Sequence, residues 1–251
     1  MVNRIREPRL RTLPYLLLFF LLPACNQTQW QQAGVDVLSQ LNSAVTQGGP
    51  LTSVEIDRGL REALRIGSQR VVARVGKRDG FNGDPSIHIP LPEKLSEARH
   101  FARKFNLDKP FHEIEVKLNR AAEDAAPHAK ALFWQAIKKM RLADVRNILD
   151  GPQDAATQYF KRTMSKELAQ VMRPVIDKSL NDVGALRTYQ RALNDYNALP
   201  FAPTIEADLS GYVLSKGMDG LFHYLAEEEA AIRRDPLKRS TELLKRVFGH
   251  P

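Results

Sequence analysis

The chain has 251 residues, of which 43% are hydrophobic and 26% are charged, and its formal net charge is +8. These proportions are typical of a soluble globular protein and exclude a disordered or low-complexity chain. The single cysteine excludes disulfide bonds within the chain.

The N-terminus has the pattern of an export signal. Arginines at positions 4, 6, 9 and 11 precede an unbroken apolar run of eight residues, from Tyr15 to Leu22. A helix that crosses a bilayer needs about 20 apolar residues, so this run is too short to span but fits the core of a signal peptide. We therefore expect residues 1–24 to be a signal.

The end of the apolar run, Leu22-Pro23-Ala24-Cys25, resembles the lipobox of bacterial lipoproteins. The resemblance implies cleavage before Cys25, which then becomes the acylated first residue of the mature chain. Two alternatives remain: ordinary secretion with cleavage near Ala24, and an uncleaved anchor. Each buried methylene contributes roughly 0.8 kcal/mol, so two or three acyl chains hold a protein on a membrane almost permanently. By the same resemblance, Asn26 is compatible with transfer to the outer membrane, where the protein would face the periplasm.

Cleavage and lipidation at Cys25 would change how the cysteine content and the net charge are interpreted. A cysteine bound to lipid leaves no thiol for catalysis, disulfides or thiolate metal sites. Four of the 37 basic and one of the 29 acidic residues lie in the signal, so the mature chain carries +5. Its positive charges are scattered among acids, which favours a solvated surface over nucleic-acid binding. The expected partners are membrane lipid, through acylated Cys25, and an envelope protein or apolar ligand, and no nucleic acid.

Residues 25–51 are expected to form a partly helical tether, and residues 52–251 a single helical domain. Thr52 and Glu55 have the spacing of a capping box, which predicts the start of a helix. Gly67 lies on the apolar stripe of that helix and indicates close approach of another backbone. The stripe recurs every three or four residues, at Ile56, Leu60, Leu64, Gly67, Val71 and Val75.

Residues 79–92 form the one long segment of this domain without a helical pattern. Glycines and aspartates at positions 79–80 and 83–84 are turn signals, and positions 87, 89 and 91 are apolar, as in an extended strand. Pro90 and Pro92 remove ladder donors, so the segment is expected to be an edge strand or a packed strap. Counted from Asp79, the EF-hand pattern fails at its third and fifth positions. A structural turn is favoured over a ligand-facing loop.

Helical patterns return after this segment. Pro127 is expected to interrupt a long helix, Pro152 to lie in the first turn of a later helix, and Pro174 to kink it. Asp208 is expected to cap a further helix, and a basic amphipathic helix closes the chain. There is almost no pattern of period two. The predicted class is therefore all-α, a compact multi-helix bundle with one long irregular loop at about residues 79–92.

Short blocks spread along the chain carry a resemblance to a family. They are Gly59-Leu60 with Glu62-Ala63-Leu64, Asp79-Gly80-Phe81, Ile89-Pro90-Leu91-Pro92, Asn119-Arg120-Ala121-Ala122-Glu123, Ala155-Ala156-Thr157 with Tyr159-Phe160, Asp219-Gly220-Leu221-Phe222, and Glu228, Ile232-Arg233 and Asp235-Pro236. Together they resemble the family called domain of unknown function 4197, from about residue 52 to Phe248. Many members resemble this chain in carrying a lipoprotein signal. Arg141 stands where the family often has Thr or Ser, and Gly217 where Ala is more usual. The resemblance implies a fold but no catalytic residue.

No motif indicates a catalytic, cofactor or metal site. Glu97 and His100 have the spacing of a di-iron motif, but a di-iron bundle needs two copies and the chain has one. His223 and Glu227 lie one turn apart without a third ligand in register, which favours a solvated pair. We therefore expect no cofactor and no metal, although paired carboxylates for hydrolysis would leave no linear signature.

The most suggestive polar residues are Asn119, Arg120 and Glu123, which lie beside an alanine-rich stripe. Arg120 and Glu123 are three residues apart, so they can pair on one helix. Alanines allow another helix to come near, and a buried charge must be paired. We expect a structural network that reaches Asp219, Arg233 or Asp235, with a ligand pocket as the alternative.

Two hypotheses for function follow. The first is a lipid-anchored, non-enzymatic helical module that binds a partner protein or an apolar ligand. The second is a periplasmic hydrolase or metal-dependent enzyme that uses scattered carboxylates such as Glu113, Glu123 and Asp219. A structure in which these carboxylates lie far apart, or pair with arginines, would remove the basis of the second hypothesis.

Overall fold

A computed structural model describes residues 51–200 and 202–234, together with Lys245 and Val247. The chain divides into two units, residues 1–50 and 51–251, and the helices below belong to the second. The described residues form α-helices and one short 3-10 helix without a strand, which confirms the predicted all-α class. None of these helices is long and apolar enough to cross a membrane. The predicted signal, Cys25, the tether and nearly all of the last basic helix lie outside the described residues.

The first described helix, α2 (Ser53–Val75), begins at the predicted capping box. The Thr52 hydroxyl accepts a hydrogen bond from the backbone N–H of Glu55, and the Glu55 carboxylate accepts one from the N–H of Thr52 at 2.8 Å. Gly67 does lie on the buried face of α2, but a β-carbon there would meet side-chain atoms of Glu228 and Ile232 at 3.4 Å. The predicted close backbone approach is therefore wrong, because side chains fill this contact.

Residues 76–92 connect α2 to the next helix as a strap packed on the bundle. Ile87, Ile89 and Leu91 are buried, but the segment makes turns and no strand. Of the two forms left open by the sequence, the strap is therefore the one adopted. A β-carbon on Gly80 would lie 2.4 Å from the carbonyl oxygen of Val75, so only glycine fits this turn. The Phe81 side chain is fully buried beneath it.

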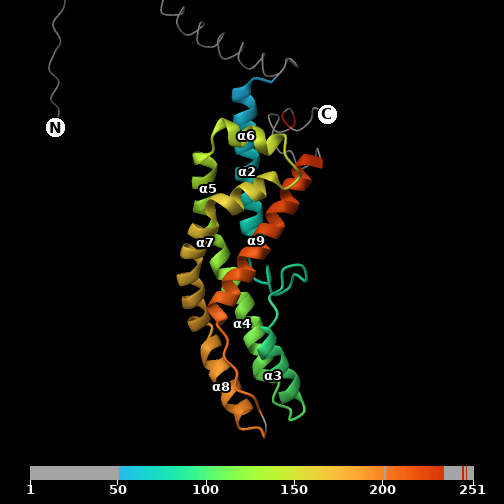
Figure 1. Ribbon diagram of the computed structural model, residues 1–251, viewed down its shortest axis with the longest axis vertical. Helices are drawn as coiled ribbons and strands as arrows, with labels where there is room; N and C mark the ends of the chain where they lie inside the picture. The colour runs from blue at the N-terminus through green and yellow to red at the C-terminus, as the bar shows by residue number, and fades with distance from the viewer. Residues whose placement is uncertain (1–50, 201, 235–244, 246, 248–251) are drawn as a thin grey trace, which may run out of the picture. The chain divides into compact units, whose positions relative to one another are not determined.

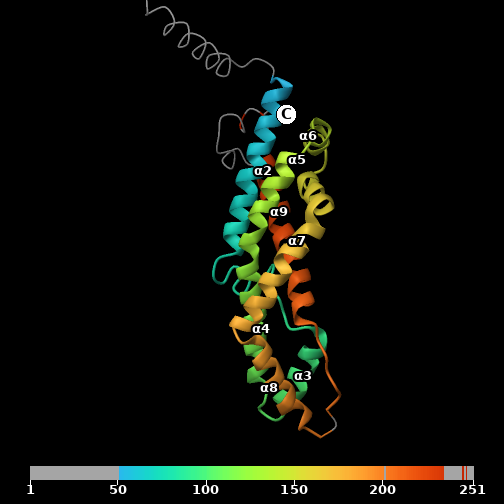
Figure 2. The same ribbon diagram turned by 90° about the vertical axis from the view of Figure 1, so that its left-hand side faces the viewer.

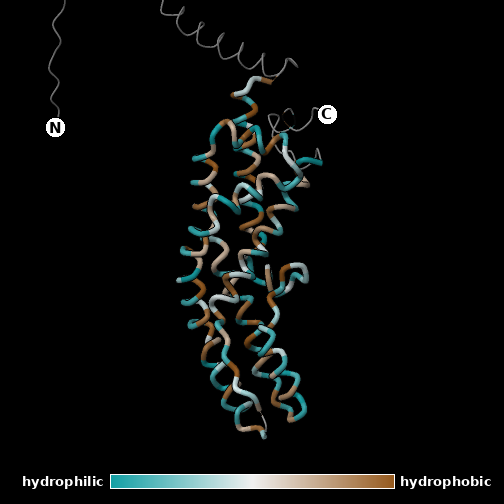
Figure 3. Tube along the Cα trace, in the orientation of Figure 1, coloured by the Kyte–Doolittle hydropathy of each residue, from teal (hydrophilic) through white to brown (hydrophobic). Residues whose placement is uncertain are grey.

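The remaining elements form one bundle around a shared hydrophobic core. Helices α2, α5 and α6 gather at one end of the second unit with the C-terminal part of α9, and α3 and α8 lie at the opposite end (Figures 1 and 2). Apolar residues recur along the helices at the spacing of one face (Figure 3). The elements are α3 (Glu93–Arg103), α4 (Lys109–Ala125), the 3-10 helix η1 (Ala126–His128), α5 (Ala129–Lys139), α6 (Leu142–Leu149), α7 (Ala155–Asp182), α8 (Ala185–Asn197) and α9 (Leu209–Arg234).

Prolines and caps explain some of the helix boundaries. Pro127 interrupts the long helical pattern as predicted, since η1 separates α4 from α5 there. Pro152 precedes α7 instead of opening it, because α7 begins at Ala155, and Pro174 lies inside α7, which continues to Asp182. The Asp208 carboxylate accepts a hydrogen bond from the N–H of Gly211 at 2.8 Å, which confirms the predicted cap of α9.

Helix α6 begins with half of a capping box. The Asp144 carboxylate accepts a hydrogen bond from the backbone N–H of Arg141 at 2.8 Å. A guanidinium has no acceptor, so Arg141 cannot return the second bond that a Thr or Ser hydroxyl would supply.

Candidate functional site

The predicted polar residues of α4 lie directly beneath the strap. The Glu123 side chain is only 4% exposed, and its Oε1 accepts hydrogen bonds from the backbone N–H groups of Phe81 at 3.1 Å and Asn82 at 3.0 Å. Its Oε2 accepts a third from Arg120 Nη1 at 2.7 Å. The carboxylate therefore satisfies two backbone donors that a turn would otherwise leave without a partner.

Arg120 joins the buried carboxylate to the surface of the strap. Its second amino group donates to Asp79 Oδ1 at 2.6 Å, so one guanidinium holds two carboxylates. This bond lowers the pKa of Asp79 from its ordinary value, with a smaller contribution from the amide of Asn82. Asp79 has a φ of 62°, a left-handed conformation that short polar side chains tolerate better than most. The charge pairs thus fix the turn at the beginning of the strap.

Asn119 fixes the end of the strap. Its side-chain Oδ1 accepts from the N–H of Ile89 at 2.9 Å, and its Nδ2 donates to the carbonyl of Ile89 at 2.8 Å. The same Nδ2 donates to the carbonyl of Glu115, one turn earlier on α4. The buried amide therefore gives the backbone of Ile89 the pairing that a neighbouring strand would supply in a sheet.

Two further polar groups hold the middle of the strap, and the sequence analysis did not single them out. Glu115 contacts His88 Nε2 at 2.9 Å and accepts a hydrogen bond from Arg99 at 2.7 Å. The Tyr224 hydroxyl of α9 donates to Asp84 at 2.6 Å, and the Arg74 guanidinium stacks 3.6 Å above the Tyr224 ring. The hydrogen bond from Tyr224 lowers the pKa of Asp84 below its ordinary value of 3.8, whereas burial raises the pKa of Tyr224.

These contacts make the attachment of the strap sensitive to acid. Because the pKa of Asp84 is lower in the folded chain, its contribution to stability is present above pH 4 and is lost as the pH falls through the folded value. We expect Asp84→Asn to lower the free energy of unfolding by about 1–2 kcal/mol near neutral pH, and by less near pH 3. Urea unfolding of both proteins at the two pH values measures the difference. A gap that stays constant with pH would contradict the assignment.

Asp219 and Arg233 do not join this network, so these two predicted partners of the α4 residues are wrong, and the third, Asp235, lies outside the described residues. Asp219 is exposed on α9. Arg233 instead pairs with Glu229 one turn away at 3.0 Å and donates to the carbonyls of Ile148 and Leu149 at the end of α6. The backbone of the strap and the side chain of Asp79 make the bonds to α4 that α9 was expected to supply.

Arg233 belongs to a second buried network, centred on Glu229. The Glu229 carboxylate accepts hydrogen bonds from the N–H groups of Ala156 and Thr157, both at 2.9 Å, and from the Thr157 hydroxyl at 3.0 Å. A carboxylate at a helix N-terminus satisfies donors that have no partner within the helix. This contact fixes the start of α7 and explains why Pro152 lies before the helix.

Glu113 and Glu123, two of the three suggested hydrolytic carboxylates, do not form a pair. Glu113 and Glu123 lie ten residues apart on α4, which separates their backbones by about 15 Å. Glu113 is solvent-exposed near Arg191, at 3.8 Å, and Glu123 is buried under the strap. Among the described residues, no three acids or histidines are placed to hold a metal ion. His223 and Glu227 form an exposed pair at 3.3 Å, and Glu97 and His100 are exposed on α3. The contacts of the site order the strap.

Three sequence blocks of the predicted family resemblance meet at the strap. Phe81, of the block Asp79-Gly80-Phe81, packs against Gly220, of the block Asp219-Gly220-Leu221-Phe222. The N–H of Phe81 also donates to Glu123, which belongs to the block on α4. The blocks therefore describe one structural unit, in which a strap is fixed between α4 and α9.

Comparison with known proteins agrees with this. The model of the family described as Protein of unknown function (DUF4197) matches residues 50–249, which takes in every described helix. No curated protein and no solved structure matches the chain. The predicted resemblance is confirmed, and the chain belongs to the DUF4197 family.

Proposed function

We propose that this protein is a lipid-anchored module of the bacterial cell envelope that binds a partner and does no chemistry. The observation that carries the anchoring is Leu22-Pro23-Ala24-Cys25, placed directly after an eight-residue apolar run and four arginines. The acylated cysteine would leave a short tether followed by the helical bundle. Asn26 favours the outer membrane, with the bundle facing the periplasm.

The contacts of the candidate site support a binding role over an enzymatic one. Catalytic acids need access to substrate, but Glu123 is buried and its oxygens already accept three hydrogen bonds. Glu229 is engaged in the same way at the start of α7. Acids with these contacts stabilise the fold, so the remaining candidates for function are surfaces of the bundle.

The anchoring is tested by changing the cysteine in the full precursor. Cys25→Ser is expected to give an unprocessed, unacylated chain, because signal cleavage at a lipobox requires the acylated thiol. Labelling with radioactive palmitate and the mobility of the chain on gels measure both effects. A matched variant, Asn26→Asp, is expected to keep label and cleavage but move to the inner-membrane fraction. Normal cleavage and free release of Cys25→Ser would overturn the proposal.

A further inference from the structure

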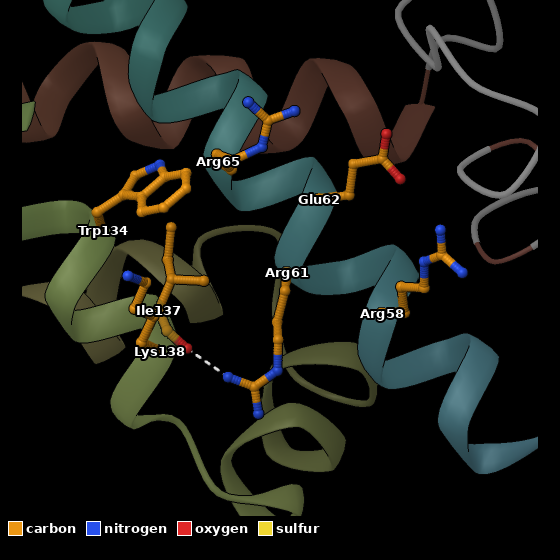
Figure 4. Close-up of a pocket in the computed structure, with 7 residues that line it drawn as sticks. All are labelled: Arg58, Arg61, Glu62, Arg65, Trp134, Ile137 and Lys138. Atoms are coloured by element: carbon orange, nitrogen blue, oxygen red, sulfur yellow. Dashed lines mark hydrogen bonds between the residues drawn. The ribbon is translucent and has the colours of Figure 1, made fainter.

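A cationic groove lies between α2 and α5. Its volume is about 390 Å³, and Figure 4 shows Trp134, Ile137 and Lys138 of α5 on one side of α2, with Glu62 and Arg58 extending from the other side of that helix. A second hollow of about 720 Å³ adjoins it, and Trp134 and Lys138 line both. The lining of the first is Arg58, Arg61, Glu62, Arg65, Trp134, Ile137 and Lys138. We call the two hollows together the basic groove.

The cations of the basic groove outnumber its acids. Lys130 of the second hollow adds to the four cations of the first, and Glu62 is the one acid that lines either hollow. Arg61 is held in place, since it pairs with Asp57 at 2.9 Å and donates to the carbonyls of Ile137 and Met140. It therefore shapes the wall by capping the end of α5.

The other cations have no such internal role. Arg58, Arg65, Lys130 and Lys138 make no ion pair with any residue that the structure describes, and Lys138 lies 4.8 Å above the ring of Trp134. Trp134 is 39% exposed, although moving an indole out of water lowers the free energy. Lys138 over the exposed indole, with Arg65 and Lys130 in the same linings, fits a ligand that carries negative charge beside an apolar surface.

The position of the groove indicates which class of ligand it binds. It lies on the helix that directly follows the tether, and the first turns of α2 and α6 expose two further apolar side chains, Val54 and Leu142. The 26 residue steps from Cys25 to Leu51 span at most about 90 Å, so an anchored chain keeps this surface near lipid at high effective concentration. Tryptophan with lysine and arginine is the combination found at membrane interfaces.

We propose that the basic groove binds the anionic headgroups of phospholipids at the membrane surface, with Trp134 entering the interface. The inference rests on the proposed anchoring, which brings the membrane within reach. It is tested separately from that anchoring, because the headgroup contact needs no acyl chain on Cys25. The chain from residue 26 onward keeps all the described helices and their core, so it serves as the non-acylated protein.

Flotation with phospholipid vesicles tests the groove. The chain from residue 26 is expected to bind phosphatidylcholine vesicles that contain phosphatidylglycerol, and to bind pure phosphatidylcholine vesicles far more weakly. The triple variant Arg58→Gln, Arg65→Gln, Lys138→Gln is expected to bind about 100-fold more weakly, since each cation near an anionic surface contributes about 1 kcal/mol. Arg61 is left unchanged because it caps α5.

A matched control removes the same number of charges at the opposite end of the bundle. Lys94, Arg103 and Lys109 are exposed on or beside α3, and their replacement by glutamine lowers the net charge equally. The control is expected to keep binding within about threefold of the parent chain, because distant charges are screened from a surface over roughly 10 Å. Equal loss in both triple variants would show attraction by net charge alone and overturn the assignment of the groove.

Tryptophan fluorescence tests whether the indole of Trp134 enters the membrane interface. The chain has two tryptophans, so Trp30→Phe leaves Trp134 as the only one. Its emission is expected to shift to the blue with phosphatidylglycerol vesicles, and brominated lipid is expected to quench it. Absence of vesicle binding, or binding without shift or quenching, would overturn the proposal. A shift of the Trp134 emission with inorganic phosphate, without any vesicle binding, would indicate that the groove binds a soluble anion, and would also overturn the proposal. Failure of the Cys25 experiment alone would leave these readouts unchanged.

Discussion

Glu123→Ala is expected to lower the free energy of unfolding by about 3–4 kcal/mol. The substitution leaves the N–H groups of Phe81 and Asn82 without their acceptor and unpairs one side of Arg120. Each buried donor left without a partner costs about 1–3 kcal/mol, and breaking a buried ion pair adds to this. Urea unfolding at neutral pH measures the loss. Glu123→Gln keeps one carbonyl acceptor and is expected to lose only about 1–2 kcal/mol.

A control on the same helix separates this effect from loss of any carboxylate. Glu113→Ala removes an exposed acid whose nearest cation, Arg191, is 3.8 Å away and also exposed. Exposed pairs of this kind contribute at most about 1 kcal/mol, so the control is expected to unfold almost as the parent chain does. If Glu123→Ala abolished a catalytic activity at unchanged stability, the structural role of Glu123 would be wrong and the enzymatic hypothesis would gain support.

Gly220→Ala is expected to lower the free energy of unfolding by about 1–3 kcal/mol. A β-carbon at Gly220 would lie 2.7 Å from Phe81 Cε1 and 3.1 Å from Ile87 Cβ. Phe81 is fully buried and cannot move aside, so α9 or the strap has to shift, which is the usual cost of an overfilled core. The same unfolding measurement tests the expectation.

Gly217 provides the matched control one turn earlier on α9. A β-carbon there would lie 3.7 Å from Ala122 Cβ and 3.8 Å from Met172 Cε, which is ordinary contact. Gly217→Ala is therefore expected to raise the free energy of unfolding by about 0.5–1 kcal/mol, since alanine favours a helix over glycine. Two variants with effects of the same sign would contradict the close approach of α9 and the strap.

Short sequence patterns correctly predicted those features of the fold that depend on contacts within one helical turn. The caps at Thr52 and Asp208, and the interruption at Pro127, depend on residues within one turn of each other, and the structure has all three. The pairing of Arg120 with Glu123 is of the same kind. The residue types involved and their spacing within one turn were enough to predict each of them.

The features that the sequence did not predict depend on contacts between segments that lie far apart in the chain. Arg120 reaches Asp79 across 41 residues, and Glu229 reaches Thr157 across 72, and no spacing rule relates such positions. The start of α7 shows the consequence, because a proline signal placed it at Pro152 but the carboxylate of α9 fixes it at Ala155. Gly67 shows a second limit of sequence-based prediction. A glycine on the buried face of a helix does not indicate whether backbone or side chains of the neighbouring helix approach it.

The central claim is that Cys25 carries lipid and holds the bundle on a membrane. The most direct test is mass spectrometry of the N-terminal peptide of the protein purified from a bacterial membrane fraction. The claim predicts a chain that begins at Cys25, with a diacylglyceryl group on its sulfur. A chain that begins at any other residue, or a Cys25 without lipid, would contradict it.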